Sequence, residues 1–132
     1  MATITLKGIG INQFGGVTSE GNVTTLRATL KMNAAGAPID ANSAAAIATG
    51  DKLILQSLPK GMLLEDAQVI ISTAMTASVT GSLGFEYADG VDSAVVPQDA
   101  AYFGTGLVLN VTGRLRCATA KAPVVLEKTA NL

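Results

Sequence analysis

Three runs of residues between positions 51 and 87 alternate apolar with polar side chains, and this alternation constrains the fold more than any other feature. The apolar positions of the successive runs are Leu53 and Leu55; Ala67, Val69 and Ile71; and Val79, Leu83, Phe85 and Tyr87. Because successive side chains of a strand point to opposite faces, each run predicts a strand with one face toward a core. Short breaks, which include Pro59 and Gly61, separate the runs and indicate an antiparallel meander.

Further strands are predicted on both sides of these runs. Residues 2–7 predict a short strand with Ile4 and Leu6 on one face, and residues 107–112 and 124–126 predict two more. Residues 22–32 predict a long one, whose faces are Leu26, Ala28, Leu30 and Met32 on one side and Thr25, Arg27, Thr29 and Lys31 on the other. About seven short strands with hardly any helical period predict one all-β domain over residues 1–132, an antiparallel β-sandwich or a small barrel.

Residues 33–50 differ in composition from the strands around them. The sequence NAAGAPIDANSAAAIATG is rich in Ala, with Gly, Pro, Asn and Ser, and Asn42 or Ser43 could cap no more than one helical turn. It predicts a long loop, either an arm that lies on a neighbouring subunit or a plain disordered excursion. We expect a second arm at the N-terminus, over about residues 1–21.

Charged residues are scarce in this chain. They make up 14% of it, against about 25% in an average soluble domain, while 48% of the residues are hydrophobic. Apolar surface that a monomer cannot hide tends to mark contacts with other chains, so we expect a subunit of an assembly; the alternative is a tightly packed soluble domain. The net charge of −1 argues against a nucleic-acid partner. We expect no membrane association and synthesis in a cytoplasm, since neither a long apolar stretch nor a signal peptide is evident.

The residues needed for common catalytic and metal sites are missing from the sequence. It has no histidine and a single cysteine, Cys117, which excludes catalytic triads and Cys- or His-rich metal sites. The neighbours Glu65 and Asp66 would point to opposite faces of a strand and could not act as a pair. Four acidic residues are spaced unlike a calcium loop: Glu86, Asp89, Asp92 and Asp99. We therefore predict a protein that is not an enzyme and holds no cofactor or metal.

The order of segments in the C-terminal two thirds resembles that of capsid decoration proteins of tailed bacteriophages, also called cement or head-stabilising proteins. The resemblance covers residues 50–128 and lies in GDKLILQSLPKGMLLEDAQVIIST, GSLGFEYADG, GLVLNVTG and APVVLEK, with an L-P-x-G turn at residues 58–61. It implies a jelly-roll-like, non-enzymatic virion subunit on the capsid exterior. Such a subunit forms small homo-oligomers and clamps neighbouring major capsid proteins.

Candidate partner contacts follow from the two arms and from a pair of arginines. We predict contacts through Thr3, Thr5, Lys7, Ala35, Ile39, Ala45, Arg114 and Arg116. The arginines would share a strand face and, with Lys121, could form a basic patch for an acidic partner or only a solvated face. The alternatives are another phage component, such as a head-to-tail or tail protein, and a carbohydrate- or receptor-binding sandwich. Exposed aromatic side chains would favour the sandwich module, but there is no Trp, and Phe85 and Tyr87 have core parity.

Overall fold

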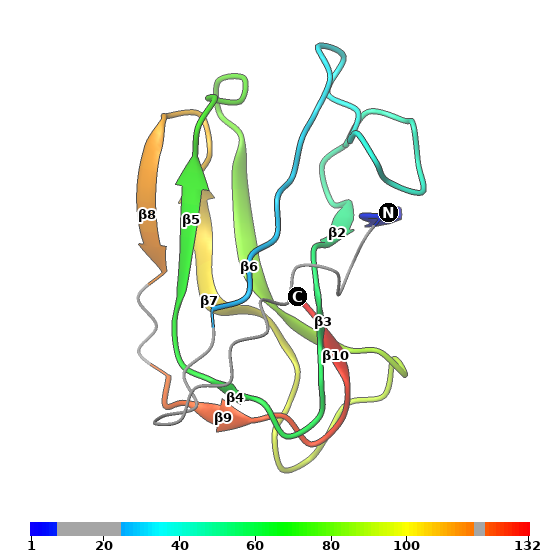
Figure 1. The fold of residues 1–132 in the computed structure, drawn as a ribbon, viewed down its shortest axis with the longest axis vertical. Coiled ribbons are helices and arrows are strands. Elements are labelled where there is room, and N and C mark those ends of the chain that lie inside the picture. The colour runs from blue at the N-terminus through cyan, green and yellow to red at the C-terminus, as the bar shows by residue number, and fades with distance from the viewer. Residues whose placement is uncertain (8–24, 118–120) are drawn as a thin grey trace. The chain divides into compact units, whose positions relative to one another are not determined.

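The computed structural model describes residues 1–7, 25–117 and 121–132, and this part of the chain is all-β, without helices (Figure 1). Its strands are β1 (Thr3–Thr5), β2 (Lys52–Ile54), β3 (Ser57–Leu58), β4 (Leu63–Leu64), β5 (Ala67–Ile71), β6 (Thr80–Tyr87), β7 (Asp99–Val108), β8 (Gly113–Cys117), β9 (Val124–Val125) and β10 (Ala130–Asn131). The all-β prediction is confirmed. A search of the described residues finds no helix long and apolar enough to cross a membrane. Two compact units, Met1–Ser57 and Leu58–Leu132, are described in turn.

In the first unit, β1 is bonded along both of its edges. It pairs with β2 in parallel, in the register Thr3 to Lys52 and Thr5 to Ile54. On its other edge the backbone N–H and C=O of Thr5 bond to Asn42, each at 3.0 Å. The side chains of Ile4 and Leu6 are buried, so the predicted parity of this strand is confirmed.

Residues 25–32 are not the hydrogen-bonded strand that their alternation predicted. The burial is as expected, since Leu26, Ala28, Leu30 and Met32 are half-buried and the residues between them are exposed. The only bridge in this stretch, within the described residues, joins Met32 to Pro38. The alternation therefore predicted correctly which side chains are half-buried. It did not predict a pairing partner, and a strand needs such a partner to form a hydrogen-bonded ladder. Residues 22–24 of the predicted strand and 8–21 of the predicted arm lie outside the described residues.

Residues 33–50 form a loop that is tied together by its own polar groups. The Asn33 side chain accepts hydrogen bonds from the backbone N–H groups of Ala35 and Ala37, at 2.9 and 3.0 Å. The N–H of Ile47 reaches back to the carbonyl of Gly36 at 3.0 Å. Gly36 has a φ of 79°, a backbone conformation that glycine adopts freely but that is sterically unfavourable for residues with a Cβ atom. The segment contains turns and isolated bridges but no strand or helix.

The second unit contains several antiparallel strand pairs with long loops between them. β6 and β7 form its longest pair, within a sheet of the order β3-β10-β6-β7, while β5 pairs with β8 and β4 with β9. The predicted meander is therefore wrong, because β5 and β6 each pair with a strand that lies later in the chain. The predicted strand over 107–112 is also misplaced, since β7 ends at Val108 and the chain turns before β8.

Four aromatic side chains from β6 and β7 make up much of the core of this unit. Phe85, Tyr87, Tyr102 and Phe103 are all buried, which confirms the core parity expected for the first two. Successive rings meet edge to face, with centroids 5.8, 5.5 and 4.9 Å apart. This is a favourable geometry for aromatic pairs, and it fixes the two strands against each other.

Candidate functional site

The predicted contact residues of the first unit lie on a strand and a loop that are bonded to each other. Lys7 donates its backbone N–H to the carbonyl of Asp40 at 2.6 Å, so the segment bonds to β2 along one edge and, from Thr5 to Lys7, to the loop along the other. Of the predicted residues, Thr3, Lys7, Ala35, Ile39 and Ala45 are exposed and Thr5 is half-buried. A partner could touch these side chains, but it would have to open existing pairs to add a strand beside β1.

Arg114 and Arg116 lie on β8 in the second unit, and both are exposed, as predicted for a shared face. Arg116 forms an ion pair with Asp66 at 3.0 Å, and Lys121 forms another with Asp99. Exposed pairs of this kind contribute about 0–1 kcal/mol to stability. These ion pairs matter more for the predicted basic patch, because each carboxylate neutralises the charge of one of the predicted cations.

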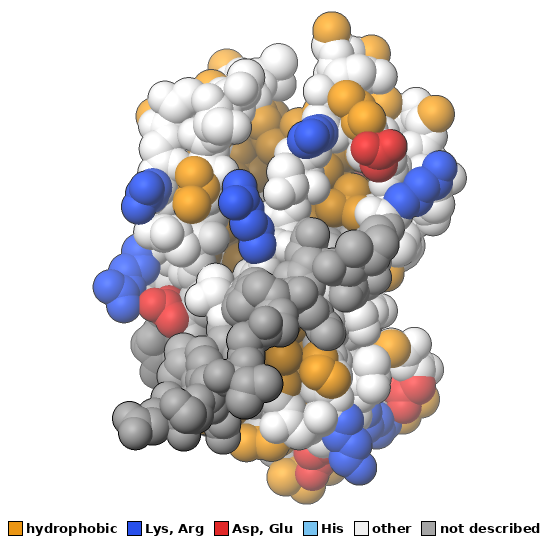
Figure 2. All heavy atoms as spheres, viewed as in Figure 1, with side chains coloured by type: hydrophobic (Ala, Val, Ile, Leu, Met, Phe, Trp, Pro, Cys, Tyr) orange, Lys and Arg blue, Asp and Glu red, His pale blue; other side chains and the backbone are white. Residues whose placement is uncertain are grey.

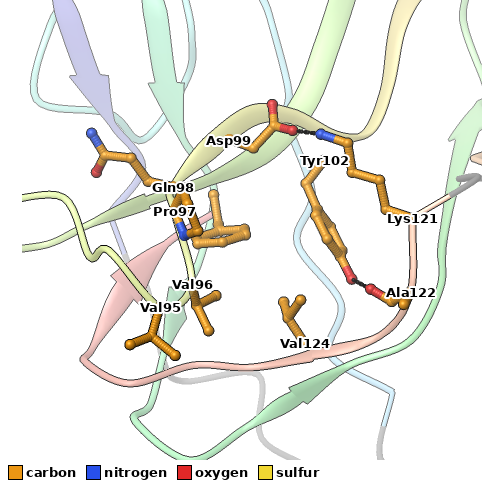
Figure 3. A pocket seen from close by; sticks show the side chains of 10 residues that line it. Val95, Val96, Pro97, Gln98, Asp99, Tyr102, Lys121, Ala122 and Val124 are labelled. Atoms are coloured by element: carbon orange, nitrogen blue, oxygen red, sulfur yellow. Dashed lines mark hydrogen bonds and ion pairs between the residues drawn. The ribbon is translucent and has the colours of Figure 1, made fainter.

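An open hollow of about 460 Å³ lies in the second unit, and the sequence patterns did not predict it. Its walls come from β6, the loop between β6 and β7, β7 itself and the segment that leads into β9 (Figure 3). The lining residues are Phe85, Val95, Val96, Pro97, Gln98, Asp99, Tyr102, Lys121, Ala122 and Val124. Hydrophobic residues predominate in this set, as they do in most pockets that bind apolar groups.

The polar groups of this hollow are engaged with one another. The Tyr102 hydroxyl donates to the carbonyl of Ala122 at 2.9 Å, and Asp99 pairs with Lys121 (Figure 3). The Gln98 side-chain oxygen accepts from the backbone N–H of Tyr87 at 3.1 Å. Burial raises the pKa of the Tyr102 hydroxyl, so this group stays protonated at neutral pH. The arrangement suits the binding of an apolar group better than proton transfer.

The acidic residues of the β6–β7 loop bond to their own backbone. Asp92 accepts from the N–H groups of Ser93 and Gln98, at 2.8 and 2.7 Å, and Asp89 accepts from that of Val91 at 2.9 Å. The Val91 N–H and the Lys128 ammonium together lower the pKa of Asp89. Among the residues that the structure describes, no cluster of three or more His, Cys, Asp or Glu side chains could hold a metal ion.

The Cys117 thiol should be unreactive in the folded protein. Its residue is 2% exposed at the end of β8, and burial raises the pKa of the thiol. Since the thiolate is the reactive form, we expect labelling by a thiol reagent at pH 8 to be at least ~100-fold slower in the native than in the urea-unfolded protein. The sequence has one cysteine, so the labelled fraction is read directly from the mass. Equal rates in the two states would show that β8 opens freely.

Comparisons with protein-family models, with curated proteins and with solved structures gave no match for this chain.

Proposed function

We propose that this chain is a structural subunit of a tailed-phage virion, made in the host cytoplasm, that binds the outside of the capsid shell and reinforces it. Its partners are the major capsid protein and further copies of itself. The scarcity of charge supports this proposal, as do the many apolar side chains that reach the solvent. The most exposed of these among the described residues are Met1, Val95, Ile70, Val111, Val91 and Val125. Among the described residues in Figure 2, white and orange areas outweigh the blue and red of charged side chains, and apolar side chains emerge in several places.

For the second unit we further propose a jelly-roll-like sandwich, with β5 and β8 in one layer and β6 and β7 in the other. The inward side chains of β5 and β6 support it, since Ile71, Phe85 and Tyr87 are buried while Gln68 and Ile70 are exposed. β8 also contacts β7. Two sheets whose apolar faces meet are the usual way in which such strands form a core.

The observation that carries the functional proposal is the extended segment 25–32 of the first unit. Among the described residues, the backbone groups of Leu26, Ala28, Thr29 and Leu30 have no hydrogen-bond partner in the backbone, and the exposed side chains on one face are polar. An extended chain whose backbone groups bond to no other described segment is a template on which a strand of another protein can be added. Strand addition depends little on side-chain charge, and it therefore suits a chain as poor in charge as this one.

A carbohydrate- or receptor-binding role has less support. Binding platforms of that kind need exposed aromatic rings, but Phe85, Tyr87, Tyr102 and Phe103 are all buried. Phe14, the fifth aromatic residue, lies outside the described residues. A head-to-tail or tail component could also bind its neighbours through apolar surface and strand addition. Binding to capsid shells distinguishes a decoration protein from such a component.

Replacing Thr29 by proline should block strand addition without unfolding the protein. Thr29 is exposed, and among the described residues its N–H bonds to no acceptor in the backbone. Proline removes this donor, and both proline and the residue before it favour extended backbone. We expect Thr29→Pro to reduce co-sedimentation with undecorated capsid shells by at least about tenfold and to change the free energy of unfolding by less than about 1 kcal/mol.

The matched control is Thr29→Val, which keeps the N–H and the β-branched shape. It should bind shells like the wild type. If Thr29→Pro bound shells as well as the wild type does, strand addition at segment 25–32 would not be the binding mechanism. If the wild-type chain never bound shells, the proposed function itself would be wrong.

A further inference from the structure

The sheet formed by β5 and β8 has an edge that no other described strand covers. β8 pairs with β5 along one side, in a register that runs from Gly113 opposite Ile71 to Cys117 opposite Ala67. Among the residues that the structure describes, no strand pairs with the other side of β8, and no backbone hydrogen bond from outside this ladder reaches it. Figure 1 shows β8 at the margin of the second unit. An extended segment could therefore be added along this outer edge.

The side chains of β8 alternate between a charged face and an apolar face. Arg114 and Arg116 are exposed, while Leu115 between them is half-buried and Cys117 is buried. An added strand would continue both faces, because side chains that lie directly opposite each other in paired strands are on the same side of the sheet. Its residue opposite Leu115 would extend the apolar face, and its residues opposite the arginines would lie on the exposed face.

The sheet compensates the positive charge of this exposed face only in part. Arg116 pairs with Asp66 at 3.0 Å. Arg114 forms no ion pair with a carboxylate of the described residues, and its cross-strand neighbour on β5 is Ile70. Opposite charges that face each other across two strands are favourable, and like charges are unfavourable. Carboxylates are therefore the side chains that best fit the positions beside the two arginines.

The same charges disfavour a second copy of β8 as the added strand. If two copies paired edge to edge about a two-fold axis at Leu115, Arg114 of each copy would lie opposite Arg116 of the other. Charged side chains commonly protect edge strands against self-pairing in this way. The edge therefore favours a strand of different sequence, and in particular an acidic one.

We propose that the outer edge of β8 binds an extended acidic segment of a partner protein, in which carboxylate side chains alternate with apolar ones. The carboxylates lie opposite Arg114 and Arg116, and the apolar side chain between them covers Leu115. Backbone hydrogen bonds of the new ladder supply affinity, and the carboxylates select the partner. The inference rests on the proposed function for the identity of this partner as a shell protein, and it adds a contact in the second unit to that of segment 25–32.

Fluorescence anisotropy of a labelled peptide mixed with the full chain tests the inference without any capsid. The acidic probe is Thr-Val-Glu-Val-Glu-Val-Thr, whose pattern is the same in both directions and fits a parallel or an antiparallel ladder. The comparison peptide has Lys in place of both Glu. We expect the acidic peptide to bind at least about fivefold more tightly at about 20 mM NaCl, and we expect this ratio to fall at about 500 mM because exposed charges are screened.

Hydrogen exchange locates the bound peptide on the chain. If the peptide adds a strand to β8, amides within Gly113–Cys117 that face the outer edge gain a hydrogen-bond partner. Their exchange should slow when the acidic peptide is bound, as measured by mass spectrometry of peptic fragments. Binding without protection of this stretch would place the peptide elsewhere and would overturn the inference.

Arg114→Glu should abolish the preference for the acidic peptide, and Arg114→Gln should reduce it. The matched control is Lys60→Glu, which changes the net charge as Arg114→Glu does but lies exposed in the turn between β3 and β4. It should keep the wild-type ratio, and far-UV circular dichroism should show all variants folded. Equal binding of the two peptides, no binding of either, or equal effects of the two glutamates would each overturn the inference. Co-sedimentation with shells would still test the proposed function separately.

Discussion

Gly84→Ala should destabilise the protein by roughly 3–5 kcal/mol, although it adds only one methyl group. A Cβ atom built on Gly84 would lie 2.0 Å from the carbonyl oxygen of Asp99 and 2.4 Å from the carbonyl carbon of Ala100. Both atoms belong to the backbone of β7, which the β6 ladder holds in place, so no side chain can move aside. The ladder is irregular at this point, with register shifts between Gly81 and Leu83 and between Leu83 and Phe85. The two strands must separate to admit the methyl group.

Urea unfolding followed by circular dichroism measures this effect, and Gly81→Ala on the same strand is its control. There the nearest atom to the new Cβ is Cδ1 of Leu109, at 3.3 Å, the end of a flexible side chain. We expect this variant to change the free energy of unfolding by less than about 1 kcal/mol. If Gly84→Ala were equally mild, the close approach of β6 and β7 would not exist in solution.

The sequence predicted which side chains face inward better than it predicted which strands pair. Parity is a local property, because alternate side chains of any extended segment point to opposite sides. It held for Ile4, for Phe85 and Tyr87, and even for residues 25–32, which form no ladder with another described segment. Pairing depends on segments far apart in the chain. β5 joins β8, some 45 residues later, and no local pattern in Ala67–Ile71 specifies that choice.

The hollow could not be predicted for a related reason. Its walls come from residues 85 to 124 along the chain, and only the pairing of β6 with β7 and of β4 with β9 brings them together. A local signal for the conformation of the β6–β7 loop was present, however. Asp92 and Ser93 are residue types that bond to backbone N–H groups a few positions ahead, and both do so in this loop. Acidic and hydroxyl residues before a Val-Val-Pro segment are thus a local pattern typical of a loop whose backbone is held by side-chain hydrogen bonds.

The neighbouring isoleucines of β5 provide the second large effect. Ile71 is 9% exposed and Ile70 is 63% exposed, so the same substitution places a carboxylate on opposite faces of one strand. Ile71→Asp should lower the free energy of unfolding by roughly 3–5 kcal/mol at neutral pH, because an unpaired charge is taken out of water. Lowering the pH should reduce this penalty, since protonation neutralises the introduced carboxylate.

Ile70→Asp is the matched control, and its expected effect is within about 0.5 kcal/mol of the wild type. Ile70 lies opposite Arg114 on β8, so an aspartate there gains a cation across the strands and loses only exposed apolar surface. Urea unfolding of both variants at pH 7 and at pH 4 measures the two changes in the free energy of unfolding and their dependence on pH. Similar losses at both would mean that β5 is covered on both faces, and the outer face would then belong to an interface. A small loss of unfolding free energy for both variants would mean that the inward face of β5 is not packed on a core. The proposed sandwich would then be wrong.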